Sequence, residues 1–127
     1  FDMLYPTGKK QDIIIPIHSK YYYKADVLAG DFLYIRRYLP EKLDGKIVIT
    51  NTTTQEDLGL LKERGIKKVI TTTPDMGGRS FGTNVIEALM VSIIGKPIDQ
   101  IRPADYYAML QELNLKPGII DLESTSA

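Results

Sequence analysis

Short runs of β-branched and other apolar residues recur along the chain, each bounded by Gly, Pro, Asp or Asn. Such runs predict buried β-strands. The expected strands cover residues 25–31, 46–50, 66–73 and 118–122. Between them, apolar residues recur every three to four positions, and this spacing predicts amphipathic helices. The expected helices cover residues 32–39, 54–65, 84–94 and 103–113.

Two of these helices carry informative residues. Thr54 and Asp57 resemble a capping box, and Gly65 supplies the left-handed residue that ends the same helix. The helix over residues 84–94 is nearly all apolar. We therefore expect it to be buried against a sheet or a partner.

Strands that alternate with helices at this spacing predict βαβ units with right-handed crossovers. The expected fold class is therefore α/β, with a short, mostly parallel sheet flanked by helices, and we assign residues 25–123 to this single domain. Residues 1–24 are irregular in pattern, and 12–17 form an edge strand at best because they contain Pro16. Residues 124–127 are expected to be a frayed tail. Because the chain opens on Phe1 without a start-like leader, we expect a fragment of a longer protein.

Composition narrows the function classes. The 127 residues are 43% hydrophobic, as in a globular domain with its own core. Sixteen basic residues balance sixteen acidic ones, so we expect neither nucleic acid nor an anionic membrane as a partner. The absence of cysteine excludes disulfides, thiolate metal sites and thiol catalysis, and a cytoplasmic location is expected. The longest apolar run, residues 85–94, is too short to span a bilayer.

Two successive strands end in threonine, in "KIVITNTTT" from Lys46 and "KKVITTTP" from Lys67. Ligands of open parallel sheets bind outside the carboxyl ends of the strands. We therefore expect residues 50–53 and 71–73 to lie near one another at a binding edge. Threonine also favours strands and caps helices, so most of these hydroxyls need no ligand to explain them.

The stretch "ITTTPDMGGRSFGTN", residues 70–84, joins the third strand to the apolar helix. Its three glycines allow close backbone approach, Arg79 offers a bidentate donor, and the helix begins near Thr83 or Asn84 with unpaired N–H groups. It matches neither a Walker loop nor Gly-x-Gly-x-x-Gly. Ligand contact and a purely structural turn both remain open as interpretations.

Other chemistry is sparse. His18 is the single histidine and has no visible carboxylate partner, so we expect a surface or packing role. One histidine and no cysteine leave no metal-ligand spacing, and we predict no metal. The neighbouring Tyr21, Tyr22 and Tyr23 suit either stacking on a flat ring or a docked amphipathic segment.

Four segments together resemble the C-terminal part of a bacterial family labelled quinate 5-dehydrogenase. They are "LYPTGKKQ", "ADVLAGDFLYIRRYLPEKLDGK", "TNTTTQED" and "TTTPDMGGRSFGTNVIEAL", and the resemblance covers nearly the whole chain. It implies an NAD(P)-linked oxidoreductase acting on a cyclic polyol acid. It also implies that the α/β domain is a three-layer Rossmann-like half domain.

In the better-understood shikimate and quinate dehydrogenases, a loop Asn-Ala/Thr-Thr-Pro-x-Gly-Met follows a strand beside the nicotinamide. Residues 71–77, "TTTPDMG", are similar, with Thr71 at the Asn position and the Gly-Met order inverted. The family's catalytic lysine and aspartate pair and its Gly-rich phosphate loop are not visible here. The catalytic residues are therefore unknown, and we expect the isolated fragment to be inactive.

The resemblance and the loop chemistry together predict contacts with NAD or NADP. The expected cofactor-binding residues are Thr50, Asn51, Thr52, Thr72, Thr73, Pro74, Gly77, Gly78, Arg79, Ser80, Gly82, Thr83 and Asn84. The expected partners are a small-molecule substrate and the missing N-terminal domain, with a homo-oligomer as a further arrangement. The alternative is a non-catalytic α/β domain that binds a small anionic ligand or docks against its missing half.

Overall fold

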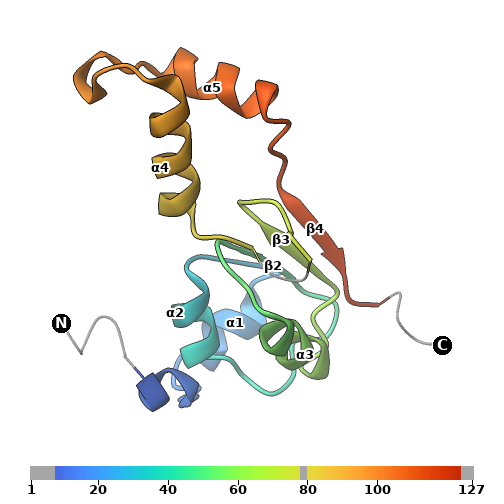
Figure 1. Ribbon diagram of the computed structural model, residues 1–127. Coiled ribbons are helices and arrows are strands. Elements are labelled where there is room, and N and C mark those ends of the chain that lie inside the picture. Colours follow the sequence, from blue (N-terminus) through green and yellow to red (C-terminus); the bar gives the residue numbers. More distant parts are fainter. Residues whose placement is uncertain (1–7, 78–79, 124–127) are drawn as a thin grey trace.

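The computed structural model describes residues 8–77 and 80–123, in which helices and strands alternate (Figure 1). The strands are β1 (Val27–Ala29), β2 (Ile47–Thr50), β3 (Lys68–Thr71) and β4 (Gly118–Asp121). The α-helices are α1 (Ser19–Lys24), α2 (Phe32–Arg37), α3 (Gln55–Glu63), α4 (Thr83–Ile94) and α5 (Pro103–Glu112). Two 3₁₀ helices, η1 (Gly8–Asp12) and η2 (Ile98–Gln100), complete the described elements.

The four strands form one sheet in the order β1-β2-β3-β4. The first three strands are parallel, and β4 is antiparallel to β3. The helices α2 and α3 connect successive parallel strands, as in βαβ units. The predicted fold class is confirmed: α/β, with a short, mostly parallel sheet flanked by helices.

One face of the sheet carries the core. Leu28, Val48 and Val69, from three neighbouring strands, are at most 8% exposed and share a cluster with residues of α2 and α3. In Figure 1 the helices α1, α2 and α3 lie together below the strands. These residues alternate with more exposed ones along each strand, which is why a single helical layer suffices to bury them.

The opposite face of the sheet carries an apolar row that crosses all four strands in register: Ala29, Ile49, Ile70 and Ile119. These side chains are half-buried or exposed, and Ile119 is 69% exposed. The described residues thus supply the sheet and one helical layer, as a Rossmann-like half domain would.

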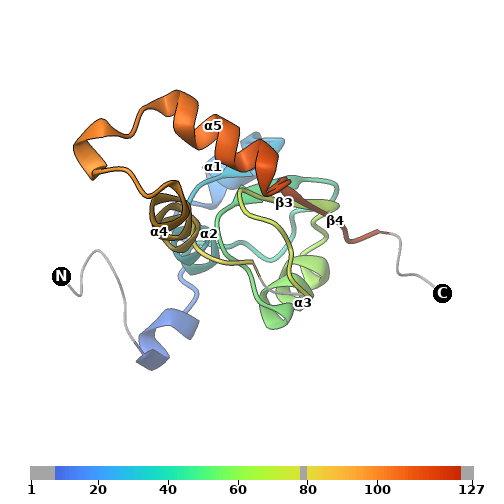
Figure 2. The same cartoon turned by 45° about the horizontal axis from the view of Figure 1, so that its top comes forward.

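The helices α4 and α5 form an arm, residues 83–112, that leaves the sheet after β3 and returns into β4 (Figures 1 and 2). Lys96 Nζ donates to Asp105 Oδ1 at 2.8 Å near the tip of the arm. Only Met90 of α4 is buried. Of the two expected neighbours, a sheet or a partner, the sheet is therefore wrong, and burial against a partner stays a prediction. The helix α5 covers the apolar surface of α4 on one side only.

The N-terminal segment also differs from expectation. The edge strand over residues 12–17 is wrong, because these residues belong to no strand. The Ile15 N–H donates to the Arg37 carbonyl at 2.6 Å, so the segment docks on the end of α2 instead of pairing with the sheet. The helix α1, which follows it, was not predicted. The expected tail, residues 124–127, lies outside the described residues.

Candidate functional site

The loops that follow β2 and β3 meet at the carboxyl edge of the parallel strands. The Thr72 N–H donates to the Thr50 carbonyl at 2.9 Å. The Thr53 N–H donates to Ser80 Oγ at 3.0 Å. The predicted convergence of the two threonine-rich strand ends is therefore confirmed.

Asn51 joins the loops after β1 and β2. Its Oδ1 accepts hydrogen bonds from the N–H groups of Thr52 at 2.7 Å and Phe32 at 3.3 Å. Its Nδ2 donates to Asp31 Oδ2 at 2.9 Å. The neighbouring Thr50 Oγ1 donates to the Gly30 carbonyl at 2.8 Å. These groups are satisfied within the protein, which gives Asn51 and Thr50 a structural role.

The buried hydroxyls after β3 are satisfied in the same way. Thr71 Oγ1 donates to the Thr73 carbonyl at 2.7 Å, and Thr73 Oγ1 donates to the Phe81 carbonyl at 2.5 Å. Ser80 Oγ donates to the Asn51 carbonyl at 3.2 Å. Most of the polar residues at this edge therefore hold the loops together.

The exposed hydroxyls of Thr72 and Thr83 differ from these. Their Oγ1 atoms lie 3.4 Å apart, and either can donate to the other. Both side chains are accessible at the base of the arm. A ligand that reached them would find two adjacent groups that each donate and accept hydrogen bonds.

These two threonines line a pocket of about 340 Å³, which we call the arm pocket. Its walls are the end of β3, the helix α4 and the helix α5. The lining residues are Thr72, Thr73, Thr83, Ile86, Glu87, Met90, Tyr106 and Leu110. Its volume and its mixture of apolar walls with a few polar groups are typical of small-molecule sites.

The arm pocket brings together residues that the sequence analysis did not single out. Ile86 and Met90 stand four residues apart on α4, and Tyr106 and Leu110 stand four apart on α5. Residues at this spacing lie on the same face of their own helix. It does not indicate that the two faces enclose a pocket, because their relation depends on how the arm folds.

The other predicted site residues are dispersed. Pro74 is half-buried, and Gly77 is exposed with a φ of 73°. Asp75 and Ser80 form an antiparallel bridge, so the loop turns back on itself between them. Gly78 and Arg79 lie outside the described residues.

The start of α4 is also shifted from expectation. Its N-cap residue is Gly82, so Thr83 and Asn84 lie inside the helix and do not cap it. Asn84 is exposed on the first turn. No side chain within the described residues caps this helix end.

Two further pockets lie away from the arm. One, of about 420 Å³, lies between the first turns of α2 and α3 and includes Asn51, Thr52 and Arg36. Arg36 is held there by ion pairs with Asp12, Glu56 and Asp57 at 3.4 to 3.6 Å.

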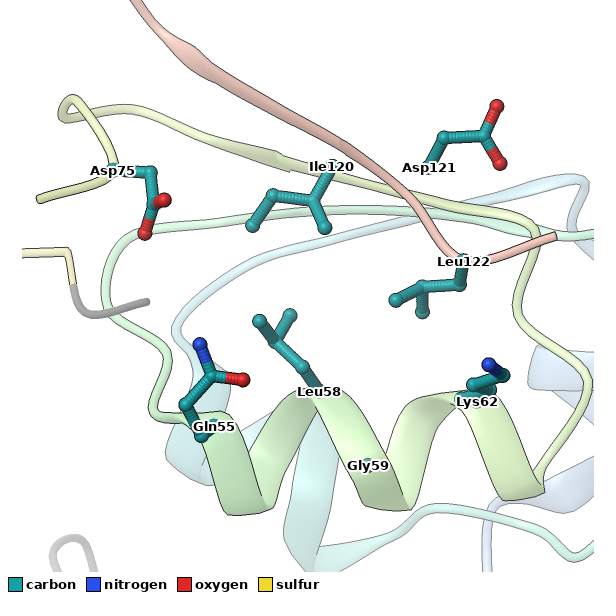
Figure 3. A pocket seen from close by; sticks show the side chains of 8 residues that line it. All are labelled: Gln55, Leu58, Gly59, Lys62, Asp75, Ile120, Asp121 and Leu122. Atoms are coloured by element: carbon teal, nitrogen blue, oxygen red, sulfur yellow. The ribbon is translucent and has the colours of Figure 1, made fainter. Parts of the chain in front are cut away.

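The other, of about 360 Å³, separates α3 from β4 (Figure 3). Leu58 points from α3 toward Ile120. Gln55 and Lys62 lie on the same helix, one on either side of Leu58. None of the predicted cofactor-binding residues lines it. Three predicted cofactor-binding residues, Thr72, Thr73 and Thr83, line the arm pocket, whereas Asn51 and Thr52 line the pocket between α2 and α3. We take the arm pocket as the candidate site because it gathers more of them.

Within residues 8–77 and 80–123, no group of three or more acidic or histidine side chains is placed to hold a metal ion. Over the same residues, no helix combines the length and apolar character that crossing a membrane requires. His18 is exposed and makes an edge contact with the Tyr38 ring at 4.8 Å between centroids.

A family model described as a domain of unknown function, DUF8754, matches residues 1–122. No significant match was found among curated proteins or among solved structures.

Proposed function

We propose that this chain, which belongs to the DUF8754 domain family, forms the nicotinamide side of the nucleotide-binding domain of an NAD(P)-linked dehydrogenase. The substrate class, by resemblance, is a cyclic polyol acid of the quinate and shikimate type. The arm pocket supports the proposal. Thr72 and Thr73, from the loop whose counterpart lies beside the nicotinamide in the resembling enzymes, line this pocket.

The lining suits a flat ring that bears an amide. Aliphatic side chains of α4 and α5 form one wall, and Tyr106 adds an aromatic face. The Thr72 and Thr83 hydroxyls, 3.4 Å apart, match the donor and acceptor of a carboxamide. When bound, the cofactor supplies the hydride chemistry, and the residues of this pocket orient the ring and limit the access of water.

Glu87 gives the arm pocket a preference for one charge state of the cofactor. Its carboxylate lines the pocket, and the oxidised nicotinamide ring is positively charged whereas the reduced ring is neutral. An opposite charge nearby favours the oxidised form. The pocket should therefore bind NAD⁺ or NADP⁺ more tightly than NADH or NADPH.

The phosphates of the cofactor need other groups. The arm pocket has no Lys or Arg among its lining residues. The pyrophosphate contacts are therefore assigned to Arg79, outside the described residues, or to another domain of the same protein. Because the groups that would bind the phosphates lie outside the arm pocket, we expect the present chain to bind the nucleotide weakly.

Titration calorimetry with NAD⁺, NADH, NADP⁺ and NADPH tests the proposal. We expect dissociation constants in roughly the micromolar to millimolar range, with the oxidised form bound more tightly. The proposal is overturned if none of the four nucleotides produces heat at millimolar concentration.

A matched pair of variants locates the site. Tyr106→Ala should weaken binding by about tenfold or more, since it removes a wall of the pocket. Tyr107→Ala, at the adjacent position and 69% exposed, should leave binding unchanged. Glu87→Gln should remove the preference for the oxidised nucleotide. Equal effects of the two tyrosine variants would exclude the arm pocket as the binding site.

The uncovered sheet face favours a second candidate function, a non-catalytic α/β domain that docks against another part of the same protein. An apolar row across four strands is unusual on a solvent-facing surface. This alternative predicts no nucleotide binding. It also predicts that Ile70→Glu, which adds a charge to the row, prevents docking when the chain is mixed with the remaining part of the protein.

A further inference from the structure

The pocket between the first turns of α2 and α3, which we call the α2–α3 pocket, has no part in the proposed function. It lies where the chain leaves β1 and β2, and its volume is about 420 Å³. It shares no lining residue with the arm pocket. A volume in this range suits a small molecule.

The walls of the α2–α3 pocket are rich in charge. Three of the lining side chains are the carboxylates of Asp31, Glu56 and Asp57, and one is the guanidinium of Arg36. Three negative charges against one positive charge leave a formal charge of −2. This excess repels an anion such as a phosphate or a second carboxylate.

Arg36 has donors that the protein does not use fully. Its Nη1 lies 3.4 Å from Asp57 Oδ1, and its Nη2 lies 3.4 Å from Asp12 Oδ1 and 3.6 Å from Glu56 Oε1. A tight pair between a guanidinium and a carboxylate has a distance of about 2.7–2.9 Å, so these pairs are loose. The Nε atom is buried and has no hydrogen-bond partner within the described residues. A ligand that accepted from Nε would satisfy this donor.

The edge of the guanidinium that carries Nε and Nη2 faces two exposed side chains. Asp12 and Glu56 lie at Nη2, and their side chains are 66% and 83% exposed. Both can therefore turn without disturbing the core. A ligand atom that enters between Arg36 and Glu56 would reach the donors of this edge, and the freed carboxylate would accept from the ligand.

Asp31 supplies a second acceptor, and this one is fixed in place. Its Oδ1 accepts from the Leu33 N–H and its Oδ2 accepts from Asn51 Nδ2, each at 2.9 Å. Each carboxylate oxygen has a further lone pair that a ligand can use. The pocket therefore combines unused donors on Arg36 with acceptors on Asp31 and Glu56.

One functional group matches this combination. A hydroxyl accepts from the Arg36 Nε–H and donates to a carboxylate at the same time. An ammonium group only donates, so it would leave Nε without a partner and add a second cation beside the guanidinium. An ionised phosphate or carboxylate only accepts, and it would face the three carboxylates of the pocket.

We propose that the α2–α3 pocket binds a neutral polyol. One hydroxyl lies between the Arg36 guanidinium and the Glu56 carboxylate, and a second donates to Asp31. The half-buried Leu33 gives the C–H groups of the ligand an apolar wall. Because the two pockets share no residue, the polyol binds whether or not the arm pocket binds a nucleotide.

Nuclear magnetic resonance titration of ¹⁵N-labelled protein tests the charge preference with three small probes. They are myo-inositol, which is neutral, quinate, which adds a carboxylate to a polyol ring, and putrescine, which carries two ammonium groups. We expect myo-inositol to shift the amide signals of residues 31–36 and 51–57 with a dissociation constant of roughly 1–10 mM. Quinate and putrescine should bind at these residues at least about fivefold more weakly.

Glu56→Gln and Glu63→Gln are a matched pair of substitutions on α3. Glu56 lines the pocket, whereas Glu63 is exposed at the other end of the helix and does not line it. Glu56→Gln should weaken myo-inositol binding by about three- to tenfold, since a neutral amide is the weaker acceptor. Glu63→Gln should leave binding unchanged.

Arg36→Lys tests the guanidinium separately. It keeps the positive charge but removes Nε and the paired donors, so binding should fall by about tenfold. Circular dichroism checks that the three variants keep the wild-type helix content. Because Glu56 is exposed, the Glu56→Gln result stands even if Arg36→Lys does not fold.

Four results would overturn the proposal. One is the absence of shifts at residues 31–36 and 51–57 up to about 100 mM myo-inositol. Another is an equal effect of Glu56→Gln and Glu63→Gln. Tighter binding of quinate or putrescine than of myo-inositol would show that the pocket selects a charged ligand. Displacement of myo-inositol by NAD⁺ would assign the pocket to the ribose of a nucleotide.

Discussion

Ser80 illustrates how the polar residues of the carboxyl edge are used. It is 1% exposed, and its hydroxyl accepts from the Thr53 N–H at 3.0 Å and donates to the Asn51 carbonyl at 3.2 Å. It therefore links the loop after β3 to the loop after β2. A buried polar group destabilises the folded state unless it has such hydrogen-bond partners. The same logic explains the hydrogen bonds that Asn51 and Thr73 make within the protein.

Ser80→Ala should lower the free energy of unfolding by roughly 1–3 kcal/mol, because the Thr53 N–H is left buried without an acceptor. The matched control is Ser92→Ala on the exposed face of α4, for which a change within about 0.5 kcal/mol is expected. Urea unfolding followed by circular dichroism measures both. Equal changes in the two variants would contradict the bridging role of Ser80.

Tyr22 anchors α1 on α2. Its hydroxyl donates to the Ile35 carbonyl at 3.1 Å. Burial, followed by the charge of Tyr38, raises the pKa of Tyr22 from 10.0 to about 12. The folded state therefore holds the phenol proton more tightly than the unfolded state does. This contribution is complete below pH 10 and is lost as the pH rises through about 12.

Tyr22→Phe should cost about 1 kcal/mol at neutral pH through the lost hydrogen bond. It should also flatten the fall in stability between pH 10 and pH 12. Tyr23→Phe, whose parent side chain is 54% exposed, should keep the wild-type pH profile. Urea unfolding at pH 7, 9 and 10.5 measures these profiles. A wild-type stability that stays constant above pH 10 would contradict the assignment.

At the scale of elements, short-range signals predicted the helices and strands well. The capping box of α3 forms as expected, with the Thr54 N–H donating to Asp57 Oδ2 at 2.9 Å and the Asp57 N–H donating to Thr54 Oγ1 at 3.3 Å. Gly65, just after that helix, has a φ of 86°. These signals succeed because both partners lie within a few residues of each other.

Gly65→Ala should lower the free energy of unfolding by at least about 1 kcal/mol. A Cβ at this position would collide with Asp44 Oδ1 and lie 2.9 Å from the Asp44 Cα, in a left-handed backbone conformation. Gly59→Ala is a control for which we expect the opposite change in the free energy of unfolding. Nothing lies within 4 Å of its added Cβ on α3, and alanine should stabilise the helix by roughly 0.5–1 kcal/mol. Thermal unfolding of both variants measures the difference.

Two elements escaped the pattern. Residues 12–17 were predicted to form at best an edge strand, yet the Ile15 N–H donates to a carbonyl at the end of α2. The apolar helix α4 was expected to be buried against a sheet or a partner, yet it leaves the sheet with α5. In both cases the pattern correctly shows that apolar surface needs a neighbour. It does not identify the neighbour.

At the scale of the whole molecule, the structure combines a sheet with one helical layer and an arm that extends from it (Figures 1 and 2). The most buried residues, including Val48 and Val69 at 0% exposure, belong to the sheet and its layer. In the arm, Met90 and Met109 are the buried hydrophobic residues. The arm should therefore open more easily than the sheet.

Hydrogen exchange followed by mass spectrometry tests this difference. Amides of β2 and β3 should exchange at least about tenfold more slowly than those of α4 and α5. Equal protection of the arm and the sheet would show that the two open as one unit.

The amino-acid sequence by itself determined the position of every strand, most helices, the α/β class and the convergence of the loops after β2 and β3. Each follows from neighbours along the chain or from the rule that parallel strands end at one edge. Tertiary structure alone decided that β4 runs antiparallel and that Asn51 and Ser80 form hydrogen bonds within the protein. It also decided that Tyr106 and Thr72 line one pocket and that one side of α4 is left exposed. These outcomes depend on contacts between residues about twenty or more positions apart, or on how whole helices are oriented, and local periodicity carries no information on either.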